Sequence, residues 1–307
     1  ITCRDWSSDV CSSDLLLGSA FGLGTILGPA IAPYLILGSL GGVEIGLAGP
    51  AFLFALFGLS VWIAVRQMLP NDLIPQAGTH GAANAYPSIG GQSSGASIMA
   101  ATEPHSEQVG YADPRIRGWM IAGLIMGHGQ AMTGQAIGFL VIDRLHLAPA
   151  LALQPTGIVL MMGAGAALLV QWGIIPNLDL RPRAMMLTGL LIATLGCVLT
   201  GLATSLYSIA CAYALASVGF GFTRPAFTAG ASLAVGHNAQ GAVAGKVTSI
   251  NGAAFVLGPS IGVGLYEAWH PLPYLTAGAA MLLLFLYARF TLRETSAISL
   301  AGAQLHR

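Results

Sequence analysis

Charge is what this chain has least of. Asp, Glu, Lys and Arg make up only 8% of its 307 residues, and the 12 acidic side chains balance the 12 basic ones. A soluble domain carries about 25% charged residues. The scarcity of charge excludes an ordinary soluble domain.

Cysteine is also rare, and its placement excludes a disulfide framework. Cys3 and Cys11 lie in the first fifteen residues, while Cys197 and Cys211 lie inside apolar stretches. No two of them have the CxxC spacing of a metal site. We therefore expect neither a metal nor a cofactor.

The sequence consists instead largely of long apolar stretches. Hydrophobic residues make up 55% of it, and each apolar stretch is close to the ~20 residues that a helix needs to cross a bilayer. The sequence predicts an all-α, polytopic membrane protein with eight transmembrane helices. The predicted spans are residues 16–37, 48–69, 118–142, 156–176, 184–203, 207–233, 243–266 and 272–291.

The first fifteen residues differ from everything that follows. The stretch "DWSSDVCSSDL" has no helical or strand period and no signal-peptide layout. Its back-translated codons resemble a sequencing-library adapter. We interpret residues 1–15 as an adapter-like scar that is not native, with a short polar tail as the alternative. The expectation is then that the native beginning of the chain is missing.

Basic residues are distributed unevenly between the two sides of the predicted membrane. One side has only Arg144. The positive-inside rule places the other side, and with it the C-terminus, in the cytoplasm of a multi-pass cell-membrane protein. A bacterial inner membrane is the expected location. The cytoplasmic side carries Arg66, Arg115, Arg117, Arg181, Arg183, Arg224, Lys246, Arg289, Arg293 and Arg307.

Residues 70–116 interrupt the apolar pattern. They are rich in Gly, Ala, Ser and Pro and have no sustained apolar period, so they cannot bury enough surface to offset the entropy lost on ordering. We predict a flexible cytoplasmic linker, with a regulatory or partner-binding segment as the alternative. The linker separates two spans in residues 16–69 from six spans in residues 117–293, which a cytoplasmic tail follows at 294–307.

One motif occurs twice, in "GTILGPAIAPYL" and in "AAFVLGPSIGVGLY". Its small residues let another helix approach closely, and its proline removes a helix hydrogen bond and bends the axis. Two copies six helices apart are the pattern of a transporter built from two six-helix halves; ordinary tight packing is the alternative. The predicted helix-interface residues are Gly24, Gly28, Pro29, Gly258 and Pro259.

These spans resemble the major facilitator superfamily, and within it the drug:proton antiporter branch. The first copy of the motif is similar to that branch's fifth-helix motif, with Ala32 and Pro33 in place of two glycines. The stretches "GFGFTRPAFTAGASLAV" and "NAQGAVAGKVTSINGAAFVLGP" are similar to the tenth and eleventh helices, and "WGIIPNLDLRPRAMMLTG" to the loop between helices eight and nine. The resemblance covers residues 16–293. It implies that the eight spans correspond to helices 5–12 of a twelve-helix, two-bundle (6+6) transporter.

The resemblance also implies secondary active transport by alternating access. We expect a monomer in the lipid bilayer that exports small amphipathic compounds in exchange for protons, without a nucleic-acid partner. A sugar, metabolite or siderophore carrier of the same superfamily is the alternative, and a non-transporting scaffold or receptor is a remote one. An enzyme is not expected, because His128 has no intramembrane acid, cysteine or second histidine as a partner.

Polar residues inside the spans are the candidates for the substrate cavity, since each is costly in hydrocarbon. His128 lies near the middle of its span and can exchange a proton near physiological pH; a neutral histidine hydrogen-bonded between helices is the alternative. Gln135, seven residues on, shares its helix face. The cavity candidates are His128, Gln130, Gln135, Asn251 and Phe255.

Charged residues near the cytoplasmic ends of the spans are the candidates for a cytoplasmic gate. Snorkelling of their long side chains or contact with lipid phosphates is the alternative. These candidates are Asp179, Arg181, Arg183, Arg224 and Lys246.

No Asp or Glu lies in the core of any predicted span. A coupling carboxylate is therefore expected in helices that precede residue 16. Proton transfer by His128, or the absence of proton coupling, are the alternatives.

Overall fold

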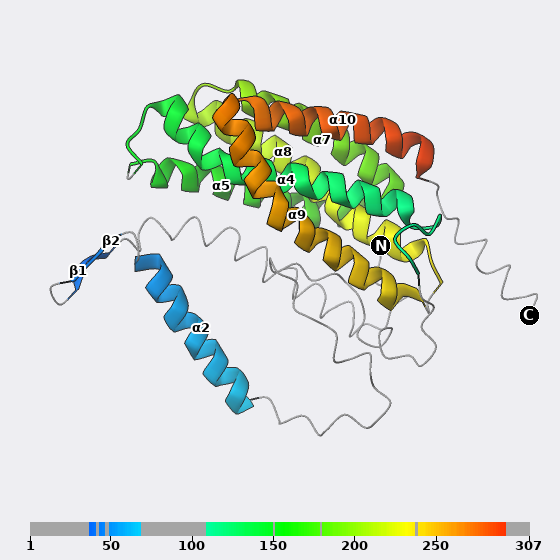
Figure 1. The fold of residues 1–307 in the computed structure, drawn as a ribbon, viewed down its shortest axis with the longest axis horizontal. Helices are drawn as coiled ribbons and strands as arrows, with labels where there is room; N and C mark the ends of the chain where they lie inside the picture. Colours follow the sequence, from blue (N-terminus) through cyan, green and yellow to red (C-terminus); the bar gives the residue numbers. More distant parts are fainter. Residues whose placement is uncertain are drawn as a thin grey trace, which may run out of the picture.

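A computed structural model of the chain describes residues 37–40, 43–46, 49–68, 109–149, 151–178, 180–236 and 239–292. The helices of its second half pack side by side as one group (Figure 1). In chain order they are α4 (Arg117–Leu145), α5 (Leu153–Leu168), the π-helical turn η4 (Leu169–Ile174), α6 (Ile175–Leu178), α7 (Pro182–Leu202), α8 (Leu206–Leu233), α9 (Gln240–Ala268) and α10 (Leu272–Thr291).

The helix α2 (Gly49–Met68) lies apart from this group (Figure 1). Its side chains are exposed from residue 51 to residue 68, and large apolar ones such as Phe52, Phe57 and Trp62 are more than half exposed. Such an all-round apolar surface is compatible with lipid or with the packing of further helices.

Six described helices are long and apolar enough to cross a membrane, judged by length and composition. The eight predicted spans are therefore not all reproduced. Residues 16–36 lie outside the described part, and the predicted span 118–142 forms α4, whose central His128, Gln130 and Gln135 lower its hydropathy. The six candidate spans are Ala51–Met68, Leu153–Leu178, Pro182–Leu202, Leu206–Leu233, Gln240–Ala268 and Leu272–Thr291.

A short antiparallel hairpin departs from the all-α expectation. Strand β1 (Leu37–Leu40) pairs with β2 (Val43–Gly46), with Leu37 opposite Gly46 and Leu40 opposite Val43. The two residues between the strands are Gly41 and Gly42, and a glycine pair favours a two-residue hairpin turn. Residue 37, the last of the first predicted span, thus belongs to a strand.

Helix α4 is the most polar of the long helices, and the other helices cover its apolar side. It packs against α8, α9 and α10, and Met126, Ile137 and Leu140 are almost completely buried. Its polar His128 and Gln135 lie on the other, accessible side. These polar side chains are the reason that hydropathy alone does not single out α4.

The closest contact in the group is between α7 and α8. A methyl group on Gly196 would overlap the backbone N and Cα of Ala216, and one on Gly219 would overlap the backbone of Ala193. A methyl group on Gly189 would lie 2.7 Å from the carbonyl oxygen of Gly219. Small residues on both helices let the two backbones touch, as is usual where van der Waals packing drives association in lipid.

Aromatic rings fill the spaces over glycines between α4 and α8. The Trp119 ring lies against Gly230, and the Phe227 ring lies against Gly123. Each helix thus receives a ring from the other, and the two contacts fix their antiparallel register. Both rings are buried.

The helix that begins at Leu153 changes to a π-helical turn at η4 and resumes as α6. The amide of Ile175 bonds to the carbonyl of Val170. Pro176 follows, and because proline has no N–H and clashes with the carbonyl four residues earlier, the regular ladder cannot continue there. The proline accounts for the wider turn before it.

The end of the predicted linker is packed rather than flexible. Val109 and Ile116 are 3% and 0% exposed in the main core, so the ordered chain begins before residue 117. In the turn between them, hydrogen bonds from Arg115 lower the pKa of Asp113 to about 2. Burial of these two apolar side chains stabilises this short segment.

Replacing Gly196 by alanine should destabilise the protein by about 1–3 kcal/mol, because the added methyl group overlaps the backbone of α8. Gly165→Ala is the matched control, since nothing lies within 4 Å of a methyl group there and alanine favours a helix by up to ~1 kcal/mol over glycine. Thermal unfolding of both variants in the same detergent should show a lower midpoint only for Gly196→Ala. Equal midpoints would contradict the close α7–α8 contact.

Candidate functional site

The atoms packed against glycines show which residues of α4, α8 and α9 lie at the same height along the helix axes. A methyl group on Gly127 of α4 would lie 2.8 Å from the Cβ of Ala254 on α9, while Phe227 of α8 covers Gly123. Because α8 runs antiparallel to α4, Arg224 falls at the level of Gly127. Within about one helical turn, 5.4 Å, of this level lie His128, Gln130, Arg224, Asn251 and Phe255, here called the polar layer.

His128 occupies the accessible side of α4. It is half-buried, and Leu124, Gln135 and Phe139 on the same helical stripe are exposed. Its Nδ1 lies 2.7 Å from the carbonyl oxygen of Leu124, and because a carbonyl only accepts, Nδ1 carries the hydrogen. The other ring nitrogen of neutral His128 is then free to accept a proton.

Gln135 lies on the same stripe as His128, seven residues towards the other end of α4. Seven residues correspond to about 10.5 Å along the axis. The structure therefore places Gln135 on the face of His128 but outside the polar layer.

The polar layer contains two amide side chains, the half-buried Gln130 and the buried Asn251. The Oε1 atom of Gln130 has no hydrogen-bond donor in the described part of the chain. Asn251 on α9 is only 7% exposed and lies one turn before Phe255. An unmet buried acceptor costs about 1–3 kcal/mol, so this layer has hydrogen-bonding capacity that the described residues do not use.

Arg224 lies inside α8. It is nine residues before the helix ends at Leu233, about 13.5 Å along the axis. Its guanidinium carbon lies 5.8 Å from the centre of the Phe255 ring, and its Nε is buried without a partner in the described residues. A role for Arg224 in a cytoplasmic gate stays a prediction.

The other gate candidates do not form one cluster. Arg183 donates to the carbonyl of Arg289 at 2.8 Å, joining the start of α7 to the end of α10. Lys246 lies 4.8 Å from the centre of the Tyr111 ring. Arg181 precedes α7, and Asp179 lies outside the described residues.

Gly258 lies where α9 contacts α4. A methyl group on Gly258 would lie 2.7 Å from the Cβ of Ala131, and one on Gly262 would lie 2.7 Å from the carbonyl oxygen of Met132. Pro259 lies between them inside α9. This contact is within the helix group, so a role between two bundles stays a prediction. The first copy of the motif, Gly24, Gly28 and Pro29, lies outside the described residues.

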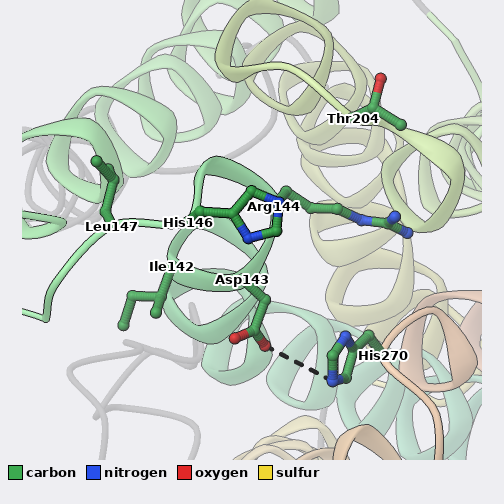
Figure 2. Close-up of a pocket in the computed structure, with 7 residues that line it drawn as sticks. All are labelled: Ile142, Asp143, Arg144, His146, Leu147, Thr204 and His270. Carbon is green, nitrogen blue, oxygen red and sulfur yellow. Dashed lines mark ion pairs between the residues drawn. The ribbon is translucent and has the colours of Figure 1, made fainter.

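A cavity that the sequence did not predict lies at the far end of α4 (Figure 2). Its volume is about 590 Å³. It combines residues from three separate parts of the chain. The lining residues are Ile142, Asp143, Arg144, His146, Leu147, Thr204 and His270.

Asp143 connects the walls of this cavity. The Tyr266 hydroxyl donates to its Oδ2 at 2.5 Å, and the Nε2 of His270 lies 3.8 Å from the same oxygen (Figure 2). The Tyr266 and His270 rings stack with centroids 4.8 Å apart. Arg144 donates to the carbonyl of Gly201 in the last turn of α7. The set ties the end of α4 to the α9–α10 junction and to α7. No sequence pattern signals it, since Asp143 lies 123 residues from Tyr266 and Arg144 lies 57 residues from Gly201.

A group of long apolar helices, six of the described ones long and apolar enough to cross a membrane, is typical of an integral membrane protein. The family model described as Major Facilitator Superfamily matches residues 16–259. This is well over half of the chain, so the chain belongs to the major facilitator superfamily. Members of this superfamily are multi-pass membrane transporters.

One solved structure similar to this chain is the crystal structure of the E. coli fucose:proton symporter. The identity is 12% and the TM-score is 0.48; the match covers 89% of this chain and 65% of the symporter. The chain thus spans about two thirds of the length of that structure. No curated protein matches the chain.

Replacing Tyr266 by phenylalanine should lower the free energy of unfolding by about 1 kcal/mol, because Asp143 loses a donor while water can reach this 39% exposed carboxylate. Tyr207→Phe is the matched control, since the Tyr207 side chain is 83% exposed. The two variants are compared by thermal unfolding in detergent. A midpoint that falls equally in both would contradict a stabilising Tyr266–Asp143 bond.

Proposed function

We propose that the protein is a proton-coupled secondary transporter that exports small amphipathic compounds by alternating access, as a monomer in a bacterial inner membrane. Membership of the superfamily supports transport. The observation that carries the coupling is His128, an accessible imidazole at mid-depth with one ring nitrogen free. The polar layer would then contact the cargo, beside Phe255 as an apolar surface.

His128 suits proton coupling for an electrostatic reason. Imidazole is the side-chain group that most readily exchanges a proton close to physiological pH. In the described helices Asp143 and Glu267 lie within three residues of a helix end, and no Asp or Glu lies nearer the middle. A proton gained by His128 places a charge in a layer that already holds Arg224, and the repulsion between them would favour a change of conformation or cargo.

The two-bundle arrangement belongs to the same proposal. Residues 117–293 would form one six-helix bundle, and residues 16–69 would provide the last two helices of the other. The exposed surface of α2 supports this division, because nothing in the described group covers it. The C-terminus would be cytoplasmic.

A carrier of sugars or other hydroxylated metabolites is the second candidate. It is favoured by the unmet Gln130 acceptor and the buried Asn251, since side-chain amides both donate to and accept from hydroxyl groups. Binding of glucose or fucose tighter than that of naphthyl compounds would support this candidate over the first.

His128→Gln should remove the pH dependence of cargo binding. The dissociation constant of naphthamide, an amphipathic compound with no charge to titrate, is measured by tryptophan fluorescence at pH values on both sides of neutrality. Linkage between a proton and a cargo changes affinity by about 5–150-fold, and this change should disappear in His128→Gln. Leu283→Ala on the exposed side of α10 is the control. An unchanged pH dependence in His128→Gln would show that another group carries the proton.

A further inference from the structure

We propose that Arg224 is an anion-recognition site and that the cargo carries an acidic group, such as a carboxylate, next to an apolar body. The proposal rests on the transport function proposed above and names its substrate class. It is based on the surroundings of Arg224, which lies well inside α8. Among the described residues, its side chain has neither an acidic partner nor a hydrogen-bond acceptor.

The depth of Arg224 makes its charge expensive. It lies about 13.5 Å inside α8, and an arginine at the centre of a membrane helix costs about 2.5–3.5 kcal/mol on insertion scales. Snorkelling relieves this cost where a long side chain reaches the interface. Here the guanidinium lies beside the ring of Phe255, a residue fifteen positions inside α9, so it is directed towards a neighbouring helix at its own depth.

No described acid lies near this charge. Asp143 and Glu267 lie at the opposite ends of α4 and α9, and Asp113 is paired with Arg115 at 2.8 Å. The nearest groups in depth on the packed helices are His128 of α4, Arg183 of α7 and Lys246 of α9, and none of them is negative. α5 and η4, which also pack against α8, contain no charged residue. The local field therefore attracts an anion.

The hydrogen-bonding capacity of Arg224 is also unused. Its Nε is buried without a partner among the described residues, and none of them accepts a hydrogen bond from its other nitrogens. A guanidinium matches a carboxylate with two parallel N–H···O bonds, which are stronger than neutral hydrogen bonds. Binding of a carboxylate would satisfy both the charge and the donors at once.

The neighbours of Arg224 fit the rest of such a cargo. The Phe255 ring, 36% exposed, offers an apolar surface directly beside the guanidinium. The amides of Gln130 and Asn251 lie at the same depth and can bond a second polar group. The site therefore suits an amphipathic acid better than an amphipathic cation, which Arg224 would repel.

Three naphthyl compounds that differ only in charge test the proposal: naphthoate, naphthamide and naphthylmethylamine. Their dissociation constants are measured by tryptophan fluorescence on the full chain in lipid nanodiscs. Naphthoate should bind the unmodified protein roughly tenfold tighter than naphthamide, the effect of one charge-assisted hydrogen-bond pair, and naphthylmethylamine should bind weakest. Naphthoate affinity should fall to that of naphthamide in Arg224→Gln, with an intermediate value in Arg224→Lys.

Arg289→Gln is the matched control, because it removes an exposed positive charge at the end of α10 and keeps the carbonyl that Arg183 contacts. Its preference for naphthoate should equal that of the unmodified protein. If Arg224→Gln does not fold, Arg224→Lys decides, since it should lower naphthoate affinity more than naphthamide affinity.

The outcomes separate the two proposals. Equal affinities for the three compounds, or a preference for naphthoate that survives in Arg224→Gln, would overturn the anion site while leaving transport of amphipathic compounds intact. Absence of binding of all three compounds would overturn the proposed function together with it.

Discussion

Contact between helix backbones through small residues is the constraint on which the rest of the structure depends. Apolar side chains gain little by leaving lipid for a protein interior, so helices in a membrane associate chiefly by close packing. Between α7 and α8 this packing is so tight that Gly196 and Gly219 leave no space for a methyl group. Every other position in the group, including the level of the polar layer, follows from the register fixed by such contacts.

The same packing allows polar groups to lie at mid-depth. With α8, α9 and α10 packed against it, α4 holds the buried Oε1 atom of Gln130 inside the group, where a lipid-facing helix could not hold it without a large cost. Arg224 and Asn251 reach the same level from α8 and α9. The polar layer therefore exists because tightly packed small residues hold three helices at a fixed relative height.

The two ends of the group are held by polar contacts of a different kind. At one end Arg183 bonds to the carbonyl of Arg289, and Lys246 lies over Tyr111. At the other end Asp143 accepts from Tyr266 beside His270. Partly exposed contacts of this kind are individually modest, so they can break and re-form at lower cost than the packed glycine contacts between them.

Apolar length, the scarcity of charge and the repeated Gly-Pro motif are properties of the sequence alone. They predicted a polytopic helical membrane protein, because a bilayer imposes its thickness and polarity on any chain that crosses it. The superfamily was indicated separately, by the resemblance of particular stretches to its helices. Neither predicted the π-helical turn, the packed Val109–Ile116 segment or the Asp143 cavity. Those features depend on which helices become neighbours, and only tertiary packing decides that, since it brings together residues that lie more than a hundred positions apart.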